Sequence, residues 1–234
     1  MVRPGKGLVA MLALPLAALA LFGLGIDRAG QVPPAMAEAA RSSSSTVPPP
    51  EAQAQADDTG RIFLDAGDAE RGHRAGLLPP GVRSILNLRQ TLQHGEYHWN
   101  DEGVPPGELT SRVDVRRQLV SVFRGGHEIG AAVVLYGTDG KETPLGRFPI
   151  RAKSADYRSR TYDAPMPYSL WMTDDGVAMH GSAVNEGRAT NGCVGVPIGF
   201  ARHVFQSAEV GDVIEVVRPP ENVARAKPLL MRDS

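Results

Sequence analysis

The sequence has very little cysteine and almost no net charge, and each shortage excludes a class of function. Only one of the 234 residues, Cys193, is a cysteine, so the chain cannot form an internal disulfide or a zinc site built from several thiolates. The 25 Lys and Arg residues are balanced by 26 Asp and Glu residues, for a formal charge of −1. This balance gives no electrostatic reason to expect a nucleic acid or an acidic lipid surface as a partner.

Glycine and proline, in contrast, are plentiful, with 26 and 19 residues. These amounts, roughly 11% and 8% of the chain, exceed the usual ~7% and ~5%. Both residue types interrupt regular helices. We therefore expect many turns or a disordered segment, and not a helical bundle.

The N-terminal segment has the pattern of an export signal. Arg3 and Lys6 precede an apolar run at residues 8–26, which Asp27 and Arg28 end. The run is close to the ~20 residues that span a bilayer as a helix, and a small-x-small cleavage pattern at residues 35–37 lies far beyond the run. We interpret residues 1–28 as a signal peptide or a membrane anchor. In both cases the remainder is expected in the periplasm or cell envelope, with the basic residues on the cytoplasmic side.

The next two segments have little regular pattern. Residues 29–60 contain no Ile, Leu, Phe, Trp or Tyr, so they cannot bury enough apolar area to fold and are predicted to be a disordered linker. Residues 61–110 form an N-terminal extension of uncertain structure, in which residues 84–91 (SILNLRQT) fit a short helix or a strand. From residue 61 onward the chain is long enough for one domain with a real core.

From residue 111 onward, short apolar runs alternate with turn signals. The run at residues 129–136 is typical of a strand buried on both faces, and Gly125-Gly126 just before it is a plausible hairpin turn. Helical periodicity is weak outside residues 199–207. The pattern predicts a mainly β fold, a sandwich or a barrel, at residues 111–218, followed by a charged C-terminal tail at residues 219–234.

The single cysteine lies in a sequence that suits nucleophilic catalysis. Cys193 follows Gly192, and His180 lies thirteen residues earlier, at the end of an apolar strand pattern and before Gly181. An imidazole beside a thiol takes its proton and holds the resulting ion pair, and the thiolate attacks a carbonyl. The N–H groups of Gly192 and Cys193 would face the developing oxyanion. The alternative is that Cys193 is a small buried hydrophobe and His180 a core histidine.

The order of motifs around these residues resembles the L,D-transpeptidase (YkuD-type) catalytic domain. The resemblance covers about residues 111–218 and implies a β-sandwich of mixed sheets with one or two short helices. The matching landmarks, in chain order, are the hairpin pattern at residues 113–126, the turn at residues 143–148 (TPLGRF), residues 166–168 (MPY), His180-Gly181, residues 190–193 (TNGC), and the closing strand at residues 211–216.

Two positions depart from the family pattern. Asn191 stands where the family usually has a His, and Gly195 stands where it usually has an Arg. The loop between His180 and Cys193 is also a few residues shorter than usual. A missing guanidinium removes a bidentate partner for a carboxylate, which Arg188 within the loop would replace unless it is a solvated loop residue. These departures bear on donor and acceptor specificity more than on the chemistry.

The resemblance implies a mechanism and a set of site residues. Cys193 would be the nucleophile and His180 the base and then the acid, with the imidazole oriented by the Gly181 carbonyl. The candidate substrate-binding residues are Tyr168, Ser182, Arg188, Thr190 and Asn191. Some of them have a structural alternative, which is core packing for the tyrosine and turn capping for the hydroxyls.

The resemblance also implies the substrate. A thioester formed on a peptidoglycan tetrapeptide stem would pass to the amine of a second stem, giving a 3-3 cross-link, or to a lysine of a lipoprotein. Release to water would instead make the protein an L,D-carboxypeptidase or amidase, and a third reading is a non-catalytic peptidoglycan-binding domain. No metal or cofactor is expected. The i, i+4 pair His94 and His98 lacks the usual Glu and is broken by Gly95, so we expect no metal there.

Overall fold

The structure is a computed structural model that describes residues 60–138 and 140–221. These residues all belong to one compact unit. The predicted signal or anchor, almost all of the predicted linker and most of the predicted tail lie outside the described residues. Within the described part of the chain, no helix is long and apolar enough to cross a membrane.

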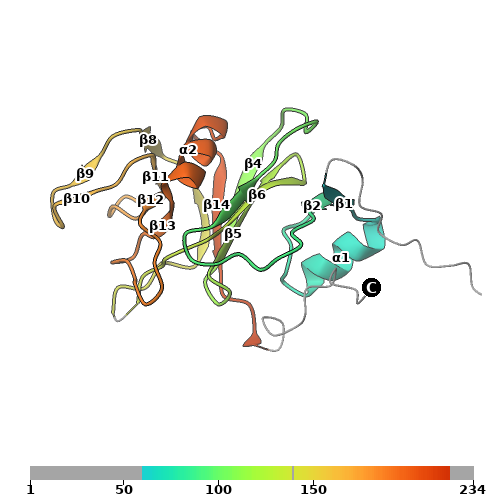
Figure 1. The fold of residues 1–234 in the computed structure, drawn as a ribbon, viewed down its shortest axis with the longest axis horizontal. Helices are drawn as coiled ribbons and strands as arrows, with labels where there is room; N and C mark the ends of the chain where they lie inside the picture. The colour runs from blue at the N-terminus through green and yellow to red at the C-terminus, as the bar shows by residue number, and fades with distance from the viewer. Residues whose placement is uncertain (1–59, 139, 222–234) are drawn as a thin grey trace, which may run out of the picture. The chain divides into compact units, whose positions relative to one another are not determined.

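The fold is mainly β, as predicted, and is built from mixed sheets with two helices (Figure 1). The larger sheet has eight strands in the order β1-β2-β6-β5-β4-β14-β7, and β3 also pairs with β6. Most neighbours are antiparallel, but β14 runs parallel to β4 and β2 parallel to β6. The strands are β1 (Arg61–Phe63), β2 (Ser84–Leu86), β3 (Tyr97–Trp99), β4 (Leu109–Asp114), β5 (Leu119–Arg124), β6 (His127–Val133), β7 (Gly146–Pro149) and β14 (Val213–Val217).

The smaller sheet has four strands in the order β13-β12-β11-β8, and a separate two-stranded hairpin projects from it. Strands β12 and β13 are parallel, whereas β11 is antiparallel to both of its neighbours. The four strands are β8 (Ala152–Ser154), β11 (Ser169–Trp171), β12 (Ala178–Ser182) and β13 (Val194–Pro197), and the hairpin consists of β9 (Arg158–Ser159) and β10 (Ala164–Pro165).

The centre of the larger sheet forms where the apolar pattern is longest. Strand β6 is buried at every residue after His127, so it has the two covered faces that its continuous apolar run predicts. The turn before it places Gly125 and Gly126 at φ 55° and 86°, the left-handed region that a tight hairpin turn demands at both central positions. The predicted hairpin is thereby confirmed.

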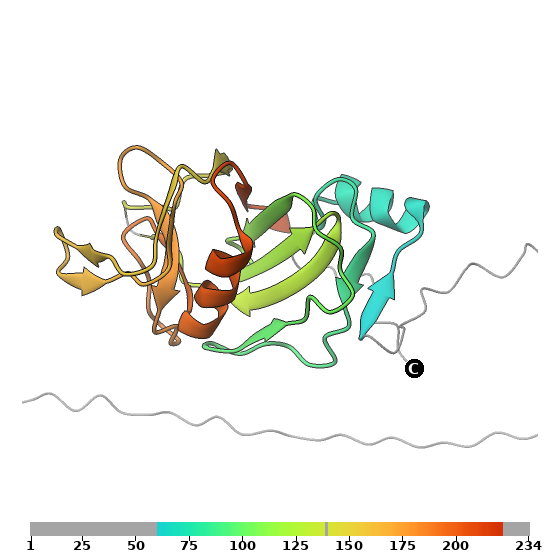
Figure 2. The ribbon, with the colours of Figure 1, turned by 90° about the horizontal axis from the view of Figure 1, so that it is seen from above.

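The helix predicted at residues 199–207 is α2 (Ile198–Ser207). It lies between the two sheets in both views (Figure 2). Its apolar face, formed by Phe200, Ala201 and Val204, is fully buried in the main core, together with side chains from both sheets. Helix α2 therefore joins the two sheets through one continuous core.

The N-terminal extension is part of the larger sheet. Residues 84–91, which fit either a helix or a strand by sequence, contribute the short strand β2. Between β1 and β2 lies α1 (Ala66–Arg74), whose N-terminus is capped by the Asp65 side chain accepting from the Asp68 N–H at 2.7 Å. The buried guanidinium of Arg61 donates to the backbone carbonyls of Asn100 and Glu128, which ties β1 to the rest of the sheet.

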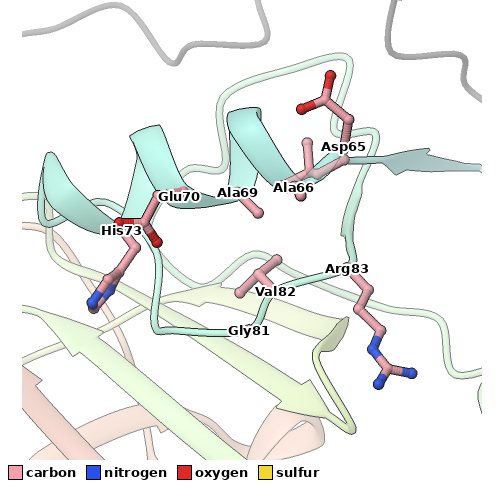
Figure 3. A pocket seen from close by; sticks show the side chains of 9 residues that line it. Asp65, Ala66, Ala69, Glu70, His73, Gly81, Val82 and Arg83 are labelled. Atoms are coloured by element: carbon pink, nitrogen blue, oxygen red, sulfur yellow. The ribbon is translucent and has the colours of Figure 1, made fainter.

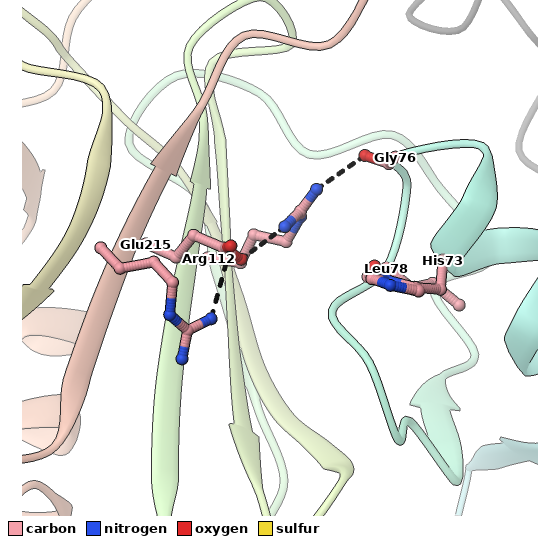
Figure 4. A network of polar contacts seen from close by, with 6 residues as sticks. His73, Gly76, Leu78, Arg112 and Glu215 are labelled. Atoms are coloured by element: carbon pink, nitrogen blue, oxygen red, sulfur yellow. Dashed lines mark hydrogen bonds and ion pairs between the residues drawn. The ribbon is translucent and has the colours of Figure 1, made fainter.

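A second polar contact joins the extension to strands β4 and β14 of the larger sheet (Figure 4). Arg112 of β4 donates to the Gly76 carbonyl, just after α1, at 2.7 Å. The same guanidinium pairs with Glu215 of β14, which also accepts from Arg147 at 3.5 Å. The side chains of Arg112 and Glu215 are largely buried, so this contact holds the end of α1 against β4 and β14.

Candidate active site

The two residues predicted to carry the chemistry lie on neighbouring parallel strands. His180 is on β12 and pairs in register with Gly195 on β13, and Cys193 immediately precedes β13. A Cβ placed on Gly195 would lie 3.2 Å from the Ser182 Cβ and 3.4 Å from the Thr190 methyl. Because alternate residues of a strand share a face, Gly195 lies on the same face of the sheet as His180 and Ser182.

The absence of a side chain at Gly195 also fits the close packing around this position. The space beside its Cα is filled by Ser182, Thr190 and the Leu135 Cβ, which would lie 3.5 Å from an added Cβ. A longer side chain at this position requires these neighbours to move. The departure from the family pattern at residue 195 is thus matched by the packing around it.

The His180 imidazole is buried and oriented by the backbone. Its Nδ1 lies 2.9 Å from the carbonyl oxygen of Gly181. A carbonyl only accepts, so Nδ1 carries the hydrogen and Nε2 keeps the lone pair that a general base needs. Burial lowers the pKa of His180 below its ordinary 6.5, and the hydrogen bond to Gly181 offsets part of this shift. The imidazole is therefore neutral at neutral pH.

The Cys193 thiol is half-buried and protonated. Burial raises its pKa above the ordinary 9.0, and a backbone hydrogen bond from Ala178 offsets part of the shift. Its sulfur lies 3.9 Å from the Gly176 carbonyl, to which the thiol donates. Within residues 60–138 and 140–221 no hydrogen bond joins this sulfur to His180. These shifts favour a resting pair of neutral thiol and neutral imidazole over the ion pair expected from sequence.

The backbone at Cys193 is held by two threonines. Its carbonyl accepts from the hydroxyl of Thr190 and, at 3.4 Å, from that of Thr143. Thr143 is buried and in turn accepts from the Gly137 N–H at 2.8 Å. Sequence reasoning did not single out Thr143 for the site, although it begins the TPLGRF turn, because fifty residues separate it from the cysteine.

Gly192 suits its position through both conformation and space. Its φ of 101° lies in the left-handed region, which side chains rarely adopt. A Cβ added to Gly137 would lie 2.5 Å from the Gly192 nitrogen, so two backbones meet here at close range. Among the described residues, the N–H groups of Gly192 and Cys193 have no hydrogen-bond acceptor. Both are uncommitted donors beside the sulfur.

The remaining predicted site residues fall into two groups. Ser182, Thr190 and Asn191 lie within the His180–Cys193 segment, where the first two are half-buried and the third is exposed, and Arg188 is exposed in the same segment. Tyr168 instead packs on the main core, with its ring 5.7 Å from that of Phe205. The adjoining Pro167 carbonyl accepts from the Gly181 N–H at 2.8 Å, so this segment supports the strand that carries His180.

A separate hollow of about 400 Å³ lies on the N-terminal extension, between α1 and residues 81–83 (Figure 3). Asp65, Glu70, His73 and Arg83 line it, and none of these residues was predicted for the site. In the described ranges, no group of three or more His, Cys, Asp or Glu residues is arranged to hold a metal ion. His98 lies on strand β3, so it does not share a helix face with His94.

Comparison with known proteins places these observations in context. Residues 110–216 match the L,D-transpeptidase catalytic domain family, YkuD. No curated protein sequence matches the chain.

Solved structures of several L,D-transpeptidases are similar to part of the chain. One from Stackebrandtia nassauensis has 23% identity and a TM-score of 0.45, over 50% of this chain and 58% of that one. One from Mycobacterium smegmatis has 21% identity and a TM-score of 0.44, over 47% and 58%. L,D-transpeptidase 1 of Mycobacterium tuberculosis has 24% identity and a TM-score of 0.41, over 47% and 61%. The chain thus spans about 60% of the length of these structures.

Proposed function

Because residues 110–216 belong to the L,D-transpeptidase (YkuD) catalytic domain family, we propose that the protein is an exported, cysteine-dependent L,D-transpeptidase acting on peptidoglycan stem peptides. One observation carries this proposal. The His180 Nδ1 hydrogen bond to the Gly181 carbonyl leaves Nε2 as a base on β12, the strand next to β13, which Cys193 immediately precedes. A base and a thiol on adjacent strands are suited to nucleophilic catalysis.

The first half-reaction would form a thioester. His180 Nε2 takes the proton of the Cys193 thiol as the sulfur attacks the carbonyl carbon at the L-centre of the third stem residue, a diaminopimelate. The tetrahedral intermediate collapses, the C–N bond to D-Ala breaks, and the imidazolium returns its proton to the leaving amine. Atoms and charge balance without a cofactor, because the proton moves from thiol to imidazole to amine.

The oxyanion of the intermediate would be stabilised by backbone donors. The N–H groups of Gly192 and Cys193 are uncommitted among the described residues and adjoin the sulfur. Their positions are fixed in advance because the two threonine hydroxyls hold the Cys193 carbonyl. Donors that need no rearrangement at the moment of reaction supply the largest electrostatic gain.

The second half-reaction would decide the product. The side-chain amine of a diaminopimelate in another stem attacks the thioester, and His180, neutral again, accepts its proton. The C–S bond of the thioester breaks and the imidazolium returns the proton to the departing sulfur, so the products are a 3-3 cross-link and a free thiol. A lysine amine of a lipoprotein would by the same step attach that protein to the wall, and water would release a tripeptide stem.

The substrate contacts would come from the segment between His180 and Cys193. Arg188 supplies a cation in this exposed loop, and a carboxylate of the stem is its natural partner. Ser182, Thr190 and Asn191 add polar groups around the cysteine. Tyr168 would act indirectly, through its packing against the main core and the Phe205 ring. The protein would work outside the cytoplasmic membrane, with residues 8–26 serving as a signal or as an anchor.

The proposal is tested with purified protein and tetrapeptide-stem muropeptides, followed by mass spectrometry of the products. Cys193→Ala and His180→Ala should each lower product formation by at least about a thousandfold with the fold intact by circular dichroism. His73→Ala, which changes an exposed histidine outside the site, is the matched control and should keep full activity.

The products also separate the alternatives. Dimers linked 3-3 support transfer, whereas tripeptide stems without dimers indicate a carboxypeptidase. If the wild-type protein yields neither, and its intact Cys193 forms no thioester adduct with a carbapenem, the protein is a non-catalytic peptidoglycan-binding domain. Wild-type transfer by Cys193→Ala would refute the mechanism.

A further inference from the structure

The segment that joins β12 to the cysteine has a single buried anchor. Of residues 183–189, all are exposed except Val184, which is 4% exposed. One backbone hydrogen bond lies within the segment, from the Arg188 N–H to the Asn185 carbonyl at 3.3 Å. A loop with so few contacts takes its position from the one side chain that it buries.

That anchor is shared with the N-terminal extension. Val184 packs in a small apolar cluster with Val133 and Leu135, and the partly buried Leu92 of the extension packs against this cluster. The backbones also meet, since a Cβ on Gly95 would lie 3.3 Å from the Val184 carbonyl oxygen. The family match begins at residue 110, so Leu92 and Gly95 lie outside it.

The part of the extension that touches the loop is itself fixed. The Glu96 carboxylate accepts from the Gln93 N–H at 2.8 Å, and the Glu96 N–H donates to the Gln93 carbonyl at 2.9 Å. These two bonds close a turn that leads directly into β3, which pairs with β6. Gly95 therefore lies within a hydrogen-bonded turn, and Leu92 immediately precedes that turn.

The same cluster is connected to the cysteine. Leu135 exchanges backbone hydrogen bonds with Gly195 at 2.8 and 2.9 Å, and the Tyr136 carbonyl accepts from the Thr190 N–H at 3.0 Å. Thr190 in turn holds the Cys193 carbonyl. A shift of the apolar cluster therefore displaces groups on both sides of the nucleophile.

We propose that Leu92 is a positioning residue for the active site, through which the N-terminal extension anchors loop 183–189 and holds Thr190 and Cys193 in register. The inference rests on the proposed function only for its kinetic consequence. The structural consequence, an ordered loop, is measurable without any substrate.

The test compares Leu92→Ala with Leu78→Ala in the full chain. Leu78 is also a half-buried leucine of the extension, but it packs on Gly72 of α1. We expect amide hydrogen exchange in residues 185–192 to be faster by about tenfold in Leu92→Ala and unchanged in Leu78→Ala. Equal exchange rates in Leu92→Ala and the wild type would overturn the proposal.

Kinetics separate positioning from general destabilisation. Leu92→Ala should lower kcat/KM for thioester formation about tenfold, and Leu92→Met, which refills the space, should restore most of it. Leu78→Ala should lower the midpoint of thermal unfolding without this kinetic loss. A kinetic loss that follows thermal stability equally in both variants would show that Leu92 only supports the fold.

A double-mutant cycle tests the route through Val184. If Leu92 acts by anchoring this side chain, Val184→Ala should produce the same faster exchange, and the combined variant should add little to either change alone. Additive effects would refute coupling through Val184. If the wild type forms no thioester but Leu92→Ala still loosens residues 185–192, the positioning inference stands and the proposed function alone fails.

Discussion

At the scale of single residues, the protonation states of His180 and Cys193 define the resting state of the site. Burial moves the two pKa values apart, down for the imidazole and up for the thiol. Both groups are then neutral across neutral pH, and in the proposed mechanism the proton moves only as the sulfur attacks a substrate carbonyl. The Gly176 carbonyl, which accepts from the thiol, supports this resting form.

The protonated resting state of Cys193 predicts the pH dependence of its alkylation by iodoacetamide. Since the thiolate is the reactive form and burial raises the thiol pKa, the midpoint of the rate increase should lie above pH 9.0, the ordinary value for cysteine. The rate constant measured between pH 5 and 10, with free cysteine as the control, checks this. A midpoint well below 9.0 would mean that an ion pair with His180 already exists at rest.

The two catalytic candidates could be found from sequence because their signals are local. Gly192-Cys193 and His180-Gly181 are dipeptides at a short spacing, and each backbone partner is a direct neighbour. Thr143, Gly137 and Gly176 hold the same cysteine from distant parts of the chain. No short sequence pattern predicts these contacts. The pairing of residues 135–137 with β13 and Thr190 brings Gly137 and Thr143 to the cysteine, and Gly176 reaches it from the turn between β11 and β12.

At the scale of elements, the longer strands and helix α2 were predicted from the sequence, whereas the shortest strands of the N-terminal extension were not. Strand β6 has a continuous apolar run and helix α2 has a helical period, and both were predicted. Strands β1, β2 and β3 have three residues each, too few for a period. They form because β6 pairs with β2 and β3, β2 pairs in turn with β1, and buried side chains such as Arg61 and Glu128 bind across the strands.

The buried carboxylate of Glu128 helps to hold these short strands, and its burial makes the ionised form less favourable. Its carboxylate is buried on β6 and accepts from the Leu86 N–H of β2 at 2.9 Å. Burial raises its pKa above the ordinary 4.5, and hydrogen bonds from Ser121 and Leu86 and the charge of Arg61 offset only part of the shift. Because the folded-state pKa exceeds that of the unfolded chain, this group favours folding most below pH 4.5. That contribution declines as pH rises through the raised value.

Glu128→Gln should therefore flatten the pH dependence of stability. The amide oxygen still accepts from Leu86 but cannot ionise, so the decline of the unfolding free energy above pH 4.5 should be smaller than in the wild type. Urea unfolding at a series of pH values measures this, with the exposed Glu209→Gln as control. Parallel curves for Glu128→Gln and the wild type would contradict the prediction.

At the scale of the whole molecule, the family match and the folded unit have different limits. The match covers residues 110–216, whereas the larger sheet also includes β1, β2 and β3 from residues 61–99. Without these strands, one edge of β6 would present unpaired backbone groups and an apolar strand to solvent. The extension is thus required by the sheet, independently of its contact with the active-site loop.

We expect residues 60–221 to fold cooperatively and residues 110–221 to lose the cooperative thermal transition or aggregate. Circular dichroism melting and size-exclusion chromatography of the two fragments test this. A sharp transition and a monomeric peak for residues 110–221 would show that the matched domain folds alone.

The protonated resting state of Cys193 has a further consequence, for chemical survival. Oxidants attack the thiolate far more readily than the thiol, and oxidation beyond the sulfenic acid is irreversible outside a few specialised systems. Since Cys193 is the single cysteine of the sequence, no second thiol of the chain would be present to rescue it from such damage. Because the thiol stays protonated and donates its hydrogen bond to the Gly176 carbonyl until a substrate arrives, the cysteine is less reactive at rest and is oxidised more slowly.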